Sequence, residues 1–182
     1  MSFFDYHTHQ LDAPAGQAII NLPEEALLAP DGFSLRPDCF YSVGIHPWWT
    51  NQDVAIYLHG LRRWAVHSQV VAIGECGLDA LRGAPLSTQE DVFMEHIVLA
   101  NELNKPLTIH CVRAYDRLLR LHRAMPSHTT WVIHGFRGKP ALAQQMLAAG
   151  FHLSFGRRYH EESLRITPLE RLHRETDSVP SE

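Results

Sequence analysis

The chain has 182 residues, and its 45% hydrophobic and 20% charged residues are typical of a globular domain rather than of a disordered chain. Its formal net charge of −4 argues against a broad basic surface for duplex DNA, although bound metal ions can give an acidic protein a phosphate site. Its 3 cysteines, without a C-x-x-C pair, a signal-peptide pattern or a long apolar run, predict a cytoplasmic protein with free thiols.

Short apolar runs recur along the chain, and several of them end at a polar residue. In chain order they cover residues 3–7, 17–21, 39–45, 70–74, 106–109, 130–133, 151–155 and 169–177. Runs of this length with such boundaries are typical of buried strands. We therefore predict eight strands.

Helical patterns lie between several of these runs. They cover residues 52–67, 88–104, 114–124 and 139–149. Ser87 with Glu90 predicts a capping box at the start of the second helix, and Gly150 predicts the end of the fourth.

Strands that alternate with helices indicate parallel pairing, and eight of them predict an α/β fold with a TIM-type (β/α)8-like barrel. An open doubly wound sheet is the alternative, but it gives less reason for a closed ring of ligands. A typical barrel has about 250 residues, so we expect this shorter one to lack full helices over residues 10–16 and 22–38 and to have no eighth helix.

In such a barrel, functional side chains gather at the carboxyl ends of the strands. His7 and His9 share one face of an extended strand and can bind one ion, although two structural histidines would give the same H-x-H pattern. Glu75 follows an apolar run, where a carboxylate needs either a cation or a salt bridge. His110 and His134 each follow an apolar strand in the same way.

The last candidate ligand is Asp177, which shares a strand face with Glu175, so one carboxylate could bind metal while the other supports it. A solvated acidic tail is the alternative. Six candidate ligands suit two ions that share a carboxylate better than one tetrahedral ion. The candidates are His7, His9, Glu75, His110, His134 and Asp177. Imidazole favours zinc, whereas carboxylates and waters also admit magnesium or manganese, so the metal stays open.

Three more residues are candidates for contact with substrate. His46 ends the third strand, Arg113 lies just beyond His110, and Arg137 lies in a glycine-flanked loop after His134. An arginine is well suited to binding phosphate. The alternatives are a loop anchor for His46, a helix charge for Arg113 and a solvated loop charge for Arg137.

These segments, in this order, resemble the TatD family of metal-dependent hydrolases, and the set resembles a shorter TatD-related branch. The matching segments are residues 5–9, 44–47, 74–79, 109–110, 134–138, 154–156 and 175–177. The resemblance implies a TIM-type barrel, two divalent ions (Mg2+, Mn2+ or Zn2+) and hydrolysis of phosphodiesters in DNA.

The resemblance also implies roles for individual residues. His7, His9, Glu75 and Asp177 would form one metal site, and Glu75 would bridge to a second site with His110 and His134. Asp177 would also accept a proton from the attacking water. His46 and Arg113 would face the substrate phosphate.

The chain also departs from the family pattern. The stretch between His9 and Gly44 is short, the segment before Glu175 is polar, and a helix after Asp177 is missing. We therefore expect one hydrolase domain over residues 1–182, truncated or divergent at its C-terminus. A hydrolase of small esters, amides or phosphoesters and a non-catalytic remnant with a metal-binding core are the alternatives.

Overall fold

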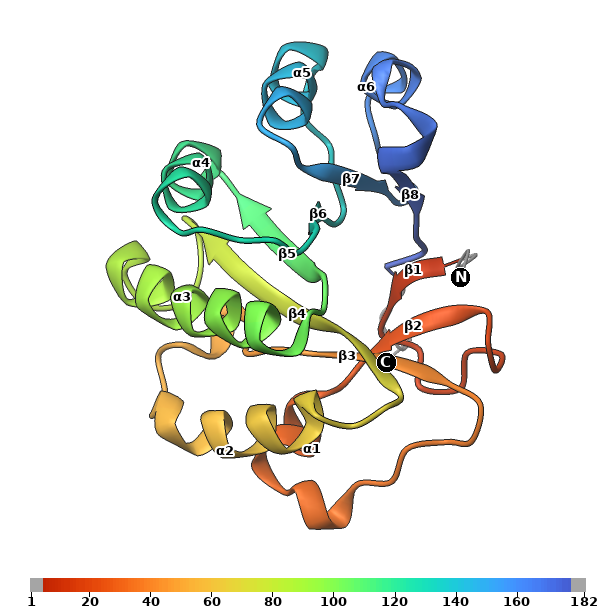
Figure 1. Ribbon diagram of the computed structural model, residues 1–182, viewed down its shortest axis with the longest axis vertical. Coiled ribbons are helices and arrows are strands. Elements are labelled where there is room, and N and C mark those ends of the chain that lie inside the picture. The colour runs from red at the N-terminus through yellow and green to blue at the C-terminus, as the bar shows by residue number, and fades with distance from the viewer. Residues whose placement is uncertain (1–4, 178–182) are drawn as a thin grey trace.

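A computed structural model describes residues 5–177 and shows one sheet of eight strands in chain order, with helices outside it (Figure 1). Each strand pairs in parallel with the next. The strands are β1 (Asp5–Thr8), β2 (Ala18–Asn21), β3 (Phe40–Val43), β4 (Val70–Asp79), β5 (Leu107–Val112), β6 (Trp131–Ile133), β7 (His152–Phe155) and β8 (Leu172–Arg174). The predicted TIM-type barrel is confirmed, although residues 3 and 4 of the first predicted strand lie outside the described residues.

The helices cover the outer side of the strands (Figure 1). They are α1 (Glu24–Leu28), α2 (Val54–Ala65), α3 (Leu86–Leu103), α4 (Tyr115–Ala124), α5 (Pro140–Ala148) and α6 (Glu161–Ile166), with short 3-10 helices at Pro30–Gly32, Pro47–Trp49 and Leu169–Arg171. The connection from β1 to β2 has no helix, and the one from β2 to β3 has only the short α1 and the 3-10 helix at Pro30–Gly32, so both lack a full helix as expected. Within residues 5–177, no helix combines the length and apolarity that a membrane crossing needs.

The barrel closes where the end of β8 lies beside β1. The backbone N–H of Asp177 donates to the His7 carbonyl over 3.1 Å. The Asp5 carboxylate accepts from the Thr176 backbone N–H (2.9 Å) and from the Thr176 hydroxyl (2.7 Å). These bonds hold the last described residues beside the first strand, so Asp177 reaches the end of the barrel that carries His7.

Buried apolar residues fill both sides of the strands. The main core lies between strands and helices and includes Phe93, Trp131 and Phe151. A second small cluster joins Tyr6 with Val132, which come from opposite parts of the sheet order. Contact between β1 and β6 is what a closed barrel interior requires.

The capping box predicted at Ser87 and Glu90 is wrong. Helix α3 begins at Leu86 with Pro85 at its N-cap position, and no side chain caps it. The Glu90 carboxylate pairs instead with Arg117 at 2.9 Å. Pro85 supplies an extended residue before the helix, and the helix starts at Leu86, two residues earlier than the capping pattern indicates.

The side chain of Gln89 holds the loop before α3 in place of a cap. Its amide nitrogen donates to the carbonyls of Asp79, Arg82 and Ala84 over 3.0, 2.9 and 2.7 Å. Its amide oxygen accepts from the Asp79 backbone N–H over 2.7 Å. Because Gln89 is buried, these bonds fix the end of β4 and the turn that follows it.

A buried histidine on α3 fixes the end of β3. The Ile45 backbone N–H donates to His96 Nε2, and His96 Nδ1 lies 2.8 Å from the Val92 carbonyl, a pair of bonds that the neutral ring alone can make. Burial lowers the pKa of His96 to about 4. The ring thereby positions the backbone beside His46.

We expect a signature of His96 in the pH dependence of stability. Its pKa is lower in the folded than in the unfolded chain, so its contribution is full above about pH 6.5 and is lost as the pH falls towards 4. The difference in free energy of unfolding between the protein and its His96→Gln variant, measured by urea titration with chelator present, should shrink by about 3 kcal/mol from pH 7 to pH 4. A difference that stays constant over this range would contradict the assignment.

Candidate metal centre

Glu75 lies at the centre of the candidate site, inside β4, which runs five residues beyond the predicted end at Gly74. Its backbone N–H donates to the Asn21 side-chain oxygen over 2.7 Å, and the Ser42 hydroxyl donates to the same oxygen over 3.2 Å. A Cβ on Gly44 would lie 2.5 Å from the Glu75 carbonyl, so only glycine allows β3 to approach here. The ends of β2 and β3 thus fix the backbone of Glu75.

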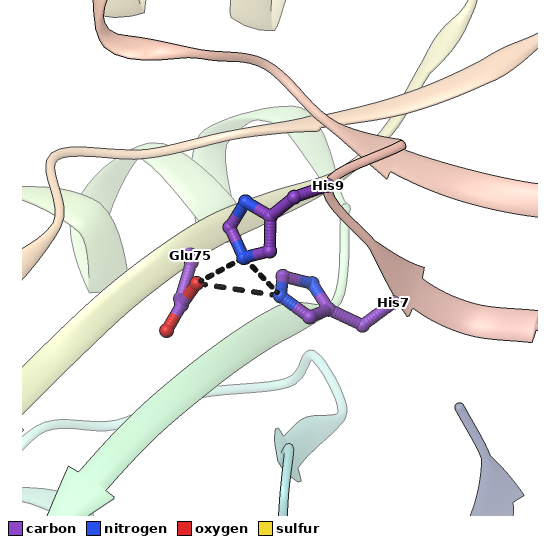
Figure 2. Close-up of side chains that lie close together, drawn as sticks. All are labelled: His7, His9 and Glu75. Carbon is purple, nitrogen blue, oxygen red and sulfur yellow. Dashed lines mark hydrogen bonds and ion pairs between the residues drawn. The ribbon is translucent and has the colours of Figure 1, made fainter. Parts of the chain in front are cut away.

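His7 and His9 approach one oxygen of the Glu75 carboxylate. Both Nε2 atoms lie 3.3 Å from Glu75 Oε2 and 3.2 Å from each other. Figure 2 shows the two rings, which both come from the N-terminal segment, pointing at the carboxylate from β4. The H-x-H spacing therefore brings both rings to the same point, as the strand geometry predicts.

Three further histidines approach the other oxygen of the carboxylate. The atoms nearest to Glu75 Oε1 are His46 Nε2 at 3.0 Å, His110 Nδ1 at 2.8 Å and His134 Nε2 at 2.8 Å. They come from the ends of β3, β5 and β6. The two oxygens of one carboxylate are thus divided between two groups of imidazoles.

The charges in this cluster are strongly coupled. Burial by itself would raise the pKa of Glu75, but the imidazoles of His134, His110 and His46 outweigh it and hold that pKa well below its usual range. Burial would lower the pKa of His134, but the Glu75 and Glu175 carboxylates raise it well above its usual value. For His46, burial outweighs the carboxylate and lowers the pKa.

The donor set fits divalent metal ions. Glu75 is only 3% exposed, and an ionised carboxylate at that depth needs positive charge nearby. His7 Nε2 and His9 Nε2 face each other and the carboxylate, an arrangement that a shared cation would satisfy. There are three groups of residues in which the candidate ligand atoms lie within 4.8 Å of one another. The groups are His7–His9–Glu75, His7–His134–Asp177 and His46–Glu75–His110. Imidazole and carboxylate are common ligands of divalent zinc and manganese.

Asp177 lies at the edge of this cluster. Its Oδ1 is 3.9 Å from His7 Nε2 and 3.8 Å from His9 Nε2, and its side chain is 31% exposed. Its backbone has a φ of 45°, in the left-handed region. Asp177 is therefore beside the histidine pair rather than in a solvated tail, and it is open on its other side.

The Glu175 carboxylate lies next to the His134 ring, on its Nδ1 side. Its Oε1 accepts from the Gly135 backbone N–H over 2.6 Å and lies 3.5 Å from His134 Nδ1, while Oε2 accepts from the Ser154 hydroxyl. Burial would raise the pKa of Glu175, but His134 outweighs it and lowers that pKa. The Glu175 carboxylate thus lies within ion-pair distance of the His134 ring, while Asp177 faces the histidine pair.

Asp79 is a site residue that the sequence patterns did not identify. Its Oδ2 lies 2.9 Å from His110 Nε2 and accepts from Trp48 Nε1 over 2.7 Å, and its Oδ1 accepts from the Leu81 backbone N–H. Asp79 therefore holds the His110 ring with Nδ1 towards Glu75. A carboxylate behind a histidine is typical of metal sites, and the signal was its position four residues after Glu75 on the same strand face.

The three predicted substrate contacts lie at different depths. Arg113 and Arg137 are exposed and line a cavity of about 690 Å3, which we name the metal-side cavity. The cavity also reaches Trp48, His110 and Asp177. His46 is buried against Glu75 instead, so it belongs to the cluster as much as to the substrate side.

A family model described as TatD related DNase matches residues 32–180 of this chain. The chain belongs to the TatD family. This membership confirms the resemblance that the ordered motifs indicated.

Two curated relatives show how the TatD family relates to this chain. It is 34% identical over 152 residues to an uncharacterised metal-dependent hydrolase, YcfH of Escherichia coli K12, covering 79% of this chain and 57% of that protein. It is also 34% identical over 150 residues to a 3′-5′ ssDNA/RNA exonuclease, TatD of Erwinia amylovora, covering 77% of this chain and 58% of that protein. The matched region thus spans somewhat more than half of these relatives.

Two crystal structures share the fold. The TatD homologue YjjV from Escherichia coli K12 superposes with a TM-score of 0.78 at 23% identity, over 96% of this chain and 78% of that one. A TatD-family hydrolase from Entamoeba histolytica gives a TM-score of 0.72 at 21% identity, over 97% and 74%. At these identities the superpositions concern the barrel alone.

We expect His110→Ala to lower the amount of divalent metal bound per chain, because it removes a nitrogen 2.8 Å from Glu75. Elemental analysis of the purified protein measures this, and His59→Ala, an exposed histidine on α2, is the matched control. Unchanged metal content in His110→Ala would remove that residue from the site.

We expect Asp79→Asn to weaken metal binding by roughly 10- to 100-fold, as is usual for a partner behind a ligand, with little change in melting temperature. Competition with a chromogenic chelator measures the affinity. Asp53→Asn is the matched control, because Asp53 only caps α2 and asparagine caps equally well. Equal affinities in the two variants would show that Asp79 does not position His110.

Proposed function

We propose that this chain is a divalent-metal-dependent hydrolase, acting as one domain over residues 1–182, that cleaves phosphodiester bonds in DNA. The observation that carries the proposal is a buried carboxylate divided between two groups of histidines, beside a cavity that Arg113 and Arg137 line. The printed name of the Erwinia relative, a 3′-5′ ssDNA/RNA exonuclease, supports a nucleic-acid substrate.

The residues assigned to the ions follow the division at Glu75. We assign His7, His9, Glu75 and Asp177 to one divalent ion, and Glu75, His110 and His134 to a second. Mg2+, Mn2+ and Zn2+ are the candidates. Such ions, when bound, lower the pKa of water and stabilise charge on phosphoryl oxygens.

The protein groups supply orientation and proton transfer. Asp177 is partly exposed beside His7 and His9, so it is placed to accept a proton from the attacking water. Arg113 and Arg137, on the same cavity, are placed to bind non-bridging phosphate oxygens. Glu175 and Asp79 keep the His134 and His110 rings in their orientations.

A reducing compartment, the cytoplasm, fits this proposal. All three cysteines are free and buried in the structure. Thiols of this kind persist where disulfides are reduced.

The second candidate function is hydrolysis of a small phosphoester. The volume of the metal-side cavity, about 690 Å3, lies in the range of small-molecule sites, which favours this reading. Comparing labelled single-stranded DNA with a chromogenic phosphodiester separates the two, because a small-molecule enzyme would turn over only the latter.

We expect the metal-loaded protein to shorten end-labelled single-stranded DNA, and Glu75→Gln to lower that rate by at least about 100-fold, since it removes the charge shared by both histidine groups. Gel analysis with Mg2+, Mn2+ and Zn2+ in turn measures this. Glu95→Gln, an exposed carboxylate on α3, should retain full activity. The loss in Glu75→Gln guards against a contaminating nuclease, because a contaminant would cleave equally in both preparations. No shortened product with any of these metals would refute the nuclease proposal, and bound metal without hydrolysis of either substrate would favour a non-catalytic remnant.

A further inference from the structure

A second, smaller cavity of about 180 Å3 adjoins the metal-side cavity, and we name it the arginine cavity. Arg137, Arg157 and Arg158 line it, and it shares Gly135, Arg137 and Asp177 with the metal-side cavity. Arg137 lies in the loop from β6 to α5, and the other two lie in the loop from β7 to α6, so neighbouring strand ends supply all three. The cavities therefore lie side by side at the end of the barrel that carries the candidate metal centre.

Among the described residues, the three guanidinium groups have no carboxylate partner. All three are exposed. Of the two carboxylates in the cavity, Glu175 already accepts from Gly135 and Ser154. The cavity thus holds more positive than negative charge, although the whole chain has a net charge of −4.

Unpaired arginines around a hollow are suited to an anion with several oxygens. A guanidinium offers paired N–H donors that match two phosphate oxygens, and an exposed arginine keeps this capacity in full. A solvated charged loop would be the alternative, but it gives no reason for arginines from two loops to face one hollow beside Asp177.

We propose that Arg157 and Arg158, together with Arg137, bind a second backbone phosphate of the DNA strand, next to the phosphate at the metal centre. This inference rests on the proposed function, because it assumes a strand that continues beyond the bond being cut. The strand then runs from the metal-side cavity towards α6, with Arg137 between the two phosphates. Binding of more than one phosphate distinguishes an oligonucleotide from a small phosphoester.

The test compares the double variant Arg157→Gln/Arg158→Gln with Arg120→Gln/Arg123→Gln, which loses the same charge from α4, away from both cavities. Fluorescence anisotropy measures binding of a labelled, phosphorothioate-linked single-stranded octanucleotide to the Mg2+-loaded proteins, since this ligand resists cleavage. We expect at least about tenfold weaker binding at low salt for the first variant only, and a slope of log affinity against log salt reduced by about 0.7, the value for one phosphate contact on a single strand.

Two further measurements test whether the effect depends on the positive charge and on a second phosphate. Arg157→Lys/Arg158→Lys should keep most of the salt slope, because it keeps the charge. Hydrolysis of bis(p-nitrophenyl) phosphate, which carries one phosphate, should be unchanged in the glutamine variant. Equal loss of octanucleotide binding in the glutamine variant and in the α4 control would overturn the second phosphate site, as would failure of the wild-type protein to bind the octanucleotide.

This design separates the inference from the proposed function. If the wild-type protein binds the octanucleotide through Arg157 and Arg158 but hydrolyses no substrate, the phosphate site stands and the hydrolase proposal fails. If it hydrolyses DNA while the glutamine variant binds and cleaves like the control, the hydrolase proposal stands and the inference fails.

Discussion

One buried carboxylate organises the functional end of this barrel. Glu75 is almost fully enclosed and yet has a lowered pKa, so the surrounding groups must supply several kcal/mol of compensation. Imidazoles from four other strand ends, including those of His7 and His134, converge on its two oxygens. The backbone N–H of Glu75 is fixed in turn by the Asn21 side chain. Divalent cations fit this arrangement, because the two groups of nitrogens lie at different oxygens of one carboxylate.

Closure of the barrel is the second constraint, because it determines where Asp177 lies. The sheet order runs from β1 to β8, and the join between these two strands depends on side chains as much as on backbone. Asp5 binds Thr176 through both carboxylate oxygens, and the next residue donates to the His7 carbonyl. The same strand that supplies His7 and His9 therefore anchors the residue that faces them. Closure and site assembly are thus coupled, because the bonds that join the last described residues to β1 also place Asp177 beside His7.

Local patterns were enough to predict the barrel and the histidine positions, whereas contacts between distant residues were not predictable. Alternation of apolar runs with helical patterns specifies parallel strands, and period-2 geometry places His7 with His9. Asn21 and Asp79 act through side-chain bonds to residues 54 and 31 positions away, which no local pattern encodes. The predicted capping box failed for a local reason, because Pro85 precedes the helix and α3 begins at Leu86 without a side-chain cap.

The net charge of the chain is a poor guide to what its functional end attracts. Electrostatic interactions are screened over about 8 Å at physiological ionic strength, so a bound anion responds mainly to nearby charges. Three arginines, Arg137, Arg157 and Arg158, line the arginine cavity, whereas its lining includes two carboxylates, those of Glu175 and Asp177. The buried imidazoles and the exposed arginines also differ in kind, because the former fit metal ions and the latter fit phosphate oxygens. The proposed hydrolysis and the proposed binding of a second phosphate are therefore separable, because they rest on the buried cluster around Glu75 and on the exposed Arg157 and Arg158, respectively.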